Sequence, residues 1–306
     1  MIRKSINKFQ TELPKKGAFT IDTEDDFPKL HTLMCASGRR GGGKSVAISN
    51  FLKKCKDKHY YDKIYLISPT YNSNKMIWDI CNILPEDVIE PDINAIKIVM
   101  KKIEADKQEW EDFLEKKKKY EMFIKDKGTN LQALNSKRLL MYYNLGFLEP
   151  EMSEPEWKYP VEQPPRIAVV IDDAMGTELL SRRTAGLINF SIKHRHVSGG
   201  LGCSIIMLVQ SYKAQGGVNR AIRENTTHLL LFKVNDFNQI KAIKEESDLP
   251  VTEEEFENMC SYAHSKPFNF LLLDFAYKCE TKRFRSGWDE YIIPPSLQGK
   301  CTCNKK

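Results

Sequence analysis

A short stretch near the start of the sequence has the residue types that hold phosphate groups. It fits the Walker A pattern G-x-x-x-x-G-K-[ST] and consists of Gly38, Arg39, Arg40, Gly41, Gly42, Gly43, Lys44 and Ser45. Glycines let backbone N–H groups turn inward around phosphate oxygens, and a helix that begins there adds its positive end. Lys44 would reach the β- and γ-phosphates, and the Ser45 hydroxyl would bind Mg²⁺. The pattern predicts a P-loop that binds ATP.

A pair of acids supplies the second part of such a site. The apolar residues Val169, Val170 and Ile171 run directly into Asp172 and Asp173. Asp172 is placed to hold Mg²⁺ or its water, as a Walker B aspartate does. Asp173 stands where a carboxylate would polarise the attacking water, which makes it the candidate general base. The alternative interpretation is a turn rich in aspartate at the end of a strand.

A glutamine at another strand end is the third candidate. The apolar segment from Ser204 to Val209 ends in Gln210. A side-chain amide both donates and accepts hydrogen bonds, so it can contact the γ-phosphate or orient water. Two arginines, Arg220 and Arg223, follow just before the next apolar segment.

The elements that would position these residues are strands alternating with helices. The chain has 306 residues and a net charge of +6, enough for one sizeable α/β domain with an insertion. Apolar runs predict strands at 30–36, 63–68, 166–171, 204–209, 228–233 and 268–275. Their continuous apolar character indicates burial on both faces, as in a mainly parallel central sheet flanked by helices. A Lys- and Glu-rich stretch from about 96 to 127 predicts a long amphipathic helix that packs on the core or on a neighbouring subunit. A mobile arm that touches DNA is the alternative.

Three regions are expected along the chain. Residues 1–27 form an N-terminal arm, residues 28–293 form the ATPase domain with a helical insertion at about 96–140, and residues 294–306 form a flexible tail. Cys301 and Cys303 supply only two ligands where structural zinc needs four, so a polar ending is favoured over a metal site. No apolar run is long enough to cross a bilayer, and no signal peptide opens the sequence. These features predict a soluble protein that is not secreted.

Four segments together resemble one family. The stretches 38–45, 169–173, 205–212 (IIMLVQSY) and 222–232 (IRENTTHLLLF) are similar to the genome-packaging ATPases of large DNA viruses and virophages, within the FtsK–HerA group of ring-forming DNA pumps. The order and spacing agree over about residues 30–290, including a closing segment FNFLLLDF…RFRSGWDEY.

The resemblance implies a RecA-like core and a homo-oligomeric ring with double-stranded DNA at its centre. ATP would be hydrolysed between subunits, and an arginine finger from one subunit would complete the site of the next. Arg223 is the first candidate for this finger, with Arg220 second and Arg195 third. An intrasubunit ion pair or a DNA contact is the alternative role for Arg223.

The implied function is packaging of a viral double-stranded genome, with a capsid or portal-vertex component as partner. The protein would then act in the virion or the host-cell cytoplasm. A helicase or DNA-transfer pump, a small-molecule P-loop kinase and a non-catalytic scaffold are the other hypotheses. The loop Gly199–Gly202, with the basic residues Lys193, His194, Arg195 and His196 before it, would either line a DNA pore or serve as a connector.

Overall fold

The computed structural model describes residues 21–24, 27–129, 134–180, 185–213, 217–234, 237–277 and 279–299. Within these residues, nine strands form one sheet in the order β3-β2-β4-β5-β1-β6-β7-β8-β9. The strands are β1 Leu33–Ser37, β2 Lys63–Ile67, β3 Val88–Ile89, β4 Ile167–Asp172, β5 Ser204–Val209, β6 His228–Phe232, β7 Phe270–Asp274, β8 Phe284–Ser286 and β9 Glu290–Tyr291. Every strand pair from β3 to β6 is parallel, as the sequence predicted.

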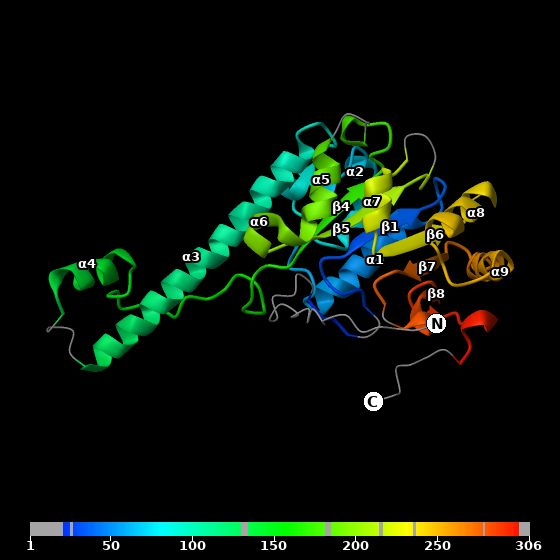
Figure 1. Ribbon diagram of the computed structural model, residues 1–306. Coiled ribbons are helices and arrows are strands. Elements are labelled where there is room, and N and C mark those ends of the chain that lie inside the picture. The colour runs from blue at the N-terminus through cyan, green and yellow to red at the C-terminus, as the bar shows by residue number, and fades with distance from the viewer. Residues whose placement is uncertain are drawn as a thin grey trace, which may run out of the picture.

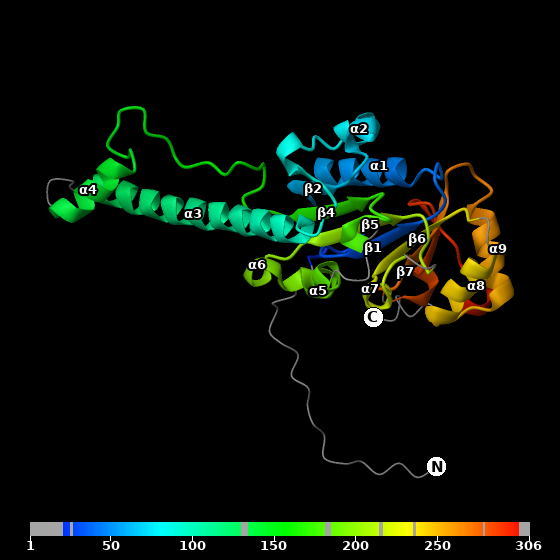
Figure 2. The ribbon, with the colours of Figure 1, turned by 90° about the horizontal axis from the view of Figure 1, so that it is seen from above.

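Helices cover both faces of this sheet (Figure 2). The α-helices are α1 Lys44–Asp57, α2 Tyr71–Asp79, α3 Ala95–Thr129, α4 Ser136–Asn144, α5 Ala185–Lys193, α6 Val197–Gly200, α7 Arg220–Asn225, α8 Phe237–Glu246 and α9 Glu253–Ala263. Short 3₁₀ turns lie at Pro85–Asp87, Glu178–Leu180, His194–His196, Glu280–Lys282 and Pro295–Leu297. None of the helices in the described part of the chain is both long and apolar enough to cross a bilayer.

Alternate residues of each central strand face opposite layers. In β1, Leu33 and Cys35 belong to the core under α5, α7 and the start of α3, whereas Met34 and Ala36 belong to the core under α1 and α2. All five residues of β1 are buried. Burial on both faces removes the polar alternation of a half-exposed strand, which explains the continuous apolar runs in the sequence.

The sheet changes direction between β6 and β7. Leu231 of β6 pairs with Leu271 of β7 in antiparallel register, and β8 and β9 continue antiparallel. The apolar run at 268–275 did not predict this direction, because a strand buried on both faces is apolar whichever way it runs. As a result, the start of β7 lies at the same edge of the sheet as the ends of the parallel strands.

The charged segment forms a single helix that projects from the sheet (Figure 1). With 35 residues, α3 is roughly 52 Å long. Its buried Val99 and Ile103 join the main core. Near its far end, Phe123 packs with Tyr142 of α4 and with Phe147 in a separate cluster. Figures 1 and 2 both show α4 at the tip of this arm, away from the sheet.

Both ends of the described chain pack against the core. Phe27 contacts the ring of Phe51 on α1 with centroids 6.2 Å apart. At the other end, Leu297 is 1% exposed, and the Ser296 N–H donates to Glu255 at 2.7 Å. Packing therefore continues beyond the boundary expected at residue 293. The start of the predicted arm, residues 1–20, and the Cys301–Cys303 tail lie outside the described residues.

Candidate active site

The predicted P-loop connects the end of β1 to the start of α1. Gly43 caps α1 with a φ of 91°, a left-handed conformation that favours glycine. Gly38 has a different reason to be glycine. A methyl group in place of its hydrogen would lie 2.4 Å from Cβ of Phe232 on β6, so only glycine fits there. The loop is thus held against the sheet, and its backbone turns at the N-terminus of α1, where an anion is favoured.

Lys44 lies inside its own loop. Its ammonium donates to the carbonyl oxygens of Gly38 at 2.7 Å and Arg39 at 3.0 Å. Burial lowers the pKa of Lys44, and the nearby carboxylates of Asp172 and Asp173 oppose that shift. The amine is therefore positioned between the loop backbone and the two acids, where phosphate oxygens would meet it.

Ser45 and Asp172 are in direct contact. The Ser45 hydroxyl donates to the Asp172 carboxylate, with oxygen–oxygen distances of 3.1 and 3.3 Å. Asp172 ends β4 and is 3% exposed. Burial, with a further contribution from the neighbouring Asp173 charge, raises the pKa of Asp172 to about 6, against the lowering effect of the Ser45 hydrogen bond.

The pair fits a magnesium ion. Mg²⁺ prefers oxygen ligands and in nucleotide sites is held by one or two protein groups together with phosphate oxygens and water. Ser45 and Asp172 supply two such oxygens on one side of the cavity. In the described part of the chain, no group of three or more His, Cys, Asp or Glu residues could hold a metal by itself. A metal here would need the nucleotide as a ligand.

Asp173 and Gln210 form the second contact between strand ends. The Gln210 side-chain amide donates to Asp173 Oδ1 at 3.1 Å. β5 lies between β4 and β1, so Gln210 emerges between the acids and the P-loop. Asp173 adopts a φ of 52°, which is uncommon for a residue other than glycine and turns the chain at the strand end. The structure thus brings together Lys44, Ser45, Asp172, Asp173 and Gln210.

A cavity of about 740 Å³ opens over these residues. Its lining includes Arg40 to Ala47, both acids and Gln210, but neither Gly38 nor Arg39. Several lining residues were not singled out from the sequence: Asn50, Thr70, Ser73, Asn74, Ile77 and Phe268. Thr70 lies three residues after the end of β2, so a polar residue shortly after a buried strand was a usable signal for that side. No local pattern pointed to Phe268.

The candidate finger residues lie outside this cavity. Arg223 on α7 donates to Glu246 of α8 at 2.7 and 3.2 Å and to the Val218 carbonyl at 2.6 Å. Its side chain is 12% exposed, so in this structure it makes the intrasubunit ion pair that the sequence left open. The Arg220 side chain is 80% exposed and pairs with Glu224 on its own helix.

The loop Gly199–Gly202 lies at the edge of the sheet opposite the P-loop. It precedes the start of β5, whereas the P-loop follows the end of the parallel strand β1. His194, expected among the basic residues at a pore, is 1% exposed and contacts the carbonyl oxygens of Ser191 and His31. Its ring is therefore held inside the protein and does not face solvent in this conformation, which leaves the two roles considered for this stretch to its other residues. Arg195 belongs to the same turn, at the edge away from the nucleotide cavity.

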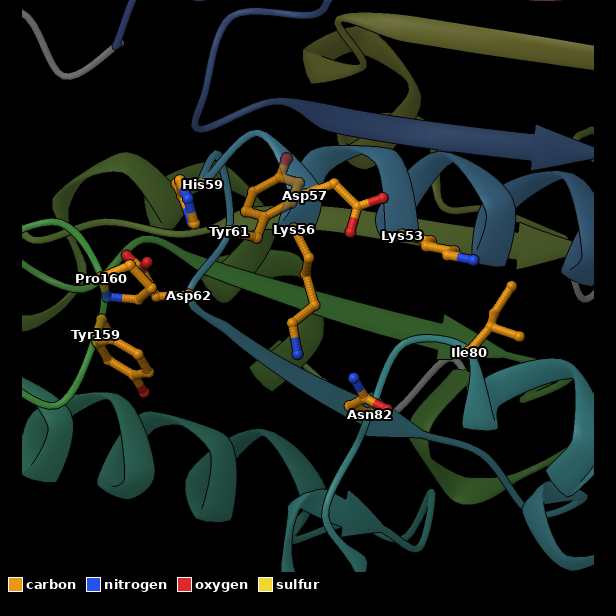
Figure 3. A pocket seen from close by; sticks show the side chains of 10 residues that line it. All are labelled: Lys53, Lys56, Asp57, His59, Tyr61, Asp62, Ile80, Asn82, Tyr159 and Pro160. Atoms are coloured by element: carbon orange, nitrogen blue, oxygen red, sulfur yellow. The ribbon is translucent and has the colours of Figure 1, made fainter.

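A second cavity, of about 560 Å³, lies near the other end of α1 (Figure 3). Lys53, Lys56 and Asp57 from α1 line it together with Asp62, Asn82 and Tyr159. Lys56 points across the cavity toward Asn82 and donates to the Cys81 carbonyl at 2.9 Å. This cavity has no glycine loop at the start of a helix. Of these two cavities, the first one carries the phosphate-binding features.

The sheet order and the loop geometry together identify the fold. It is an α/β fold with a parallel central sheet and a P-loop between β1 and α1. No protein-family model and no curated protein sequence matches the chain.

Three solved structures illustrate what the chain resembles in outline. The genome-packaging NTPase B204 of Sulfolobus turreted icosahedral virus 2, in complex with ATP-gammaS, is 12% identical over 80% of this chain and 93% of its own, with a TM-score of 0.42. EssC (ATPases 2 and 3) of Geobacillus thermodenitrificans is 14% identical over 88% of this chain, with a TM-score of 0.38, and the chain spans 40% of its length. The pCW3 conjugation coupling protein TcpA is 17% identical over 81% of this chain and 58% of its own, with a TM-score of 0.37. None of these similarities assigns a role to a residue of this chain.

Proposed function

We propose that the protein binds Mg²⁺-ATP in the P-loop cavity and hydrolyses it. The observation that carries this proposal is the contact between the Ser45 hydroxyl and the Asp172 carboxylate beside the Lys44 ammonium. A cation, two oxygen ligands and a helix N-terminus converge there, which is the set that a triphosphate and its metal require. Bound Mg²⁺ would neutralise negative charge on the β- and γ-phosphate oxygens.

Each side chain then has a defined task. Lys44 leaves its loop carbonyls for the β- and γ-phosphates, and Ser45 and Asp172 hold the metal. Asp173 accepts a proton from the attacking water, while the Gln210 amide, which contacts Asp173, orients that water. In-line attack on the γ-phosphorus gives ADP and inorganic phosphate. Catalysis here consists of positioning and charge stabilisation, as is usual for phosphoryl transfer.

We further propose that hydrolysis drives translocation of double-stranded DNA during packaging of a viral genome. Support comes from the sequence resemblance in the stretches 205–212 and 222–232. These stretches comprise the end of β5 that carries Gln210, and α7 with the strand β6 that follows it. The motor would be a ring of identical subunits that contacts DNA without reading its sequence and docks on a capsid or portal-vertex component. The net charge of +6 is compatible with such a partner.

Arg223 would serve as the finger in that ring. Its planar guanidinium suits the charge that spreads over the γ-phosphoryl oxygens. To reach the nucleotide of a neighbouring subunit, Arg223 has to break its ion pair with Glu246. Arg220 is the second candidate because its side chain is already largely exposed.

The test is the ATPase rate of the purified protein alone, with linear double-stranded DNA, and with single-stranded DNA. Stimulation by duplex DNA without strand separation supports a packaging motor. Strand separation would assign a helicase instead. Phosphate transfer to added nucleosides, with no release of inorganic phosphate, would contradict an ATPase. A Lys44→Ala variant run in parallel shows whether the measured activity belongs to this site.

A further inference from the structure

Phe268 differs from the other phenylalanines of the protein. It is 71% exposed, and it is the only exposed one among the phenylalanine side chains that the structure describes. It lines the nucleotide cavity and contacts the P-loop, since a methyl group on Gly43 would lie 2.9 Å from its Cβ. Its ring is therefore accessible to a ligand in this cavity.

The backbone of Phe268 is also strained. Its φ is 58°, and a bulky residue in this left-handed region is a true outlier. The residues around it hold it there. Asn269 donates to the Ala263 carbonyl at 3.0 Å and to the Ser286 hydroxyl at 2.9 Å, which anchors the turn to α9 and β8. Strain that the surroundings enforce in this way is typical of ligand contacts.

The sheet order places Phe268 on the side of the P-loop opposite the acids. From β1, the strands β5 and β4 lead to Gln210 and Asp172, while β6 and β7 lead the other way. Phe268 lies two residues before the start of β7, and the antiparallel direction of β7 brings it to the P-loop edge. A triphosphate whose γ-phosphate lies at the acids therefore extends its nucleoside toward Phe268.

The first turn of α1 supplies a second apolar surface on the cavity. Val46 follows Ser45 and is 48% exposed, and Asn50, one turn later, also lines the cavity. A flat heteroaromatic base would be contacted by the Phe268 ring and the Val46 methyl groups. Asn50 would offer a donor and an acceptor at its edge.

We propose that Phe268 is the stacking platform for the nucleobase of the bound nucleoside triphosphate. This inference rests on the proposed binding of ATP at the P-loop and adds the residue that holds the base. Stacking accepts any base because each has a π-face, so Phe268 contributes affinity for nucleotides in general.

The test compares a ligand that has a base with one that lacks it. Dissociation constants for Mg²⁺-ATP and for Mg²⁺-tripolyphosphate are measured by titration calorimetry for the wild type, Phe268→Ala and Phe268→Tyr. We expect Phe268→Ala to weaken ATP binding by about tenfold or more and to leave tripolyphosphate binding within about twofold. Phe268→Tyr keeps an aromatic ring and should bind both ligands as the wild type does.

Two further variants separate the possible failures. Tyr143→Ala removes an aromatic side chain that is 67% exposed at the tip of the arm, and it should change neither dissociation constant. Lys44→Ala should weaken the binding of both ligands.

The outcomes are then distinguishable. If ATP binding depends on Lys44 and Phe268→Ala does not weaken it, the stacking role is wrong while the ATP site stands. Equal losses for both ligands in Phe268→Ala would also contradict stacking, because the ring would then be supporting the P-loop. If the wild type binds neither ligand, the ATP site and the platform both fail.

Discussion

The hydroxyl of Ser45 and the carboxylate of Asp172 meet at 3.1 Å, joining the first turn of α1 to the last residue of β4. The two residues are 127 positions apart in sequence, and the long helix α3 lies between them. Their contact closes one side of the cavity before any ligand arrives. The two oxygen atoms proposed to hold the metal therefore lie side by side without a ligand.

Removing the P-loop amine should remove nucleotide binding. We expect Lys44→Ala to weaken Mg²⁺-ATP binding by about tenfold or more, because the charge-assisted contacts to the phosphates are lost. Equilibrium binding of a fluorescent ATP analogue measures this. Lys53→Ala, about two and a half turns along the same helix at the second cavity, is the matched control and should bind normally. Equal affinities for the wild type and Lys44→Ala would remove the assignment of the P-loop.

Asp172 should reduce the stability of the empty protein above pH 6. Its folded pKa of about 6 lies above its ordinary value of 3.8. Between these values the folded state holds a proton that the unfolded state releases, so stability falls as pH rises through this window. Asp172→Asn should therefore increase the free energy of unfolding at pH 7.5 by up to about 3 kcal/mol, at about 1.4 kcal/mol per pKa unit.

The increase in the free energy of unfolding caused by Asp172→Asn should fall to roughly half at pH 5, because Asp172 of the folded wild type is already largely protonated there. Urea unfolding at the two pH values measures it, with the exposed Asp57→Asn as the control. The same variant should lose Mg²⁺-dependent nucleotide binding. A loss of stability at pH 7.5, or a gain that is the same at both pH values, would contradict this account of Asp172.

The carboxylate of Asp173 should matter for turnover rather than for binding. Asp173→Asn keeps a side chain that can accept from Gln210 but cannot take a proton from water. We expect the rate of ATP hydrolysis to fall by about 10² to 10⁴, with the dissociation constant for ATP nearly unchanged. Single-turnover hydrolysis and equilibrium binding measure the two effects. Loss of ATP binding would instead assign Asp173 to the metal.

Arg223 and Arg220 can be separated by mixing variants. As the finger, Arg223→Ala should reduce turnover by about 10³ or more, whereas Arg220→Ala should have little effect. Mixing Arg223→Ala with Lys44→Ala subunits should restore part of the activity, because some interfaces then combine an intact P-loop with an intact arginine. The absence of restoration at every mixing ratio would exclude a role for Arg223 in a neighbour's site.

Arg223→Ala also needs a control for folding, since it breaks the ion pair with Glu246. Glu246→Gln removes the carboxylate charge of that pair and leaves the arginine in place. If Glu246→Gln lowers turnover as much as Arg223→Ala does, the ion pair supports the fold and the finger assignment fails. Thermal unfolding of both variants measures the structural contribution directly.

Sequence alone predicted the parts of the site that depend on local patterns. The predicted strand from Ser204 to Val209 matches β5 residue for residue. The P-loop, the two acids and Gln210 each lie at the end of a parallel strand, namely β1, β4 and β5. The ends of parallel strands lie at the same edge of the sheet, so residues that follow these strands in the sequence are close together in the structure.

The remaining features depend on contacts between distant segments. The direction of β7 is not encoded in its apolar residues, and Phe268 reaches the P-loop only because of that direction. The partner of Arg223 lies on α8, and no local pattern distinguishes Glu246 from its acidic neighbours. The buried position of His194 likewise follows from its contact with the His31 carbonyl, 163 residues earlier.

The projecting arm gives the protein a mechanical property that a compact ATPase domain lacks. α3 is anchored in the main core at Val99 and Ile103, and its tip carries a hydrophobic cluster of its own. The 26 residues of α3 beyond Ile103 form a lever roughly 39 Å long, which converts a tilt of roughly 10° at its root into a displacement of roughly 7 Å at its tip. Small rotations of the sheet and its helices would therefore become large strokes at α4, far from the nucleotide cavity.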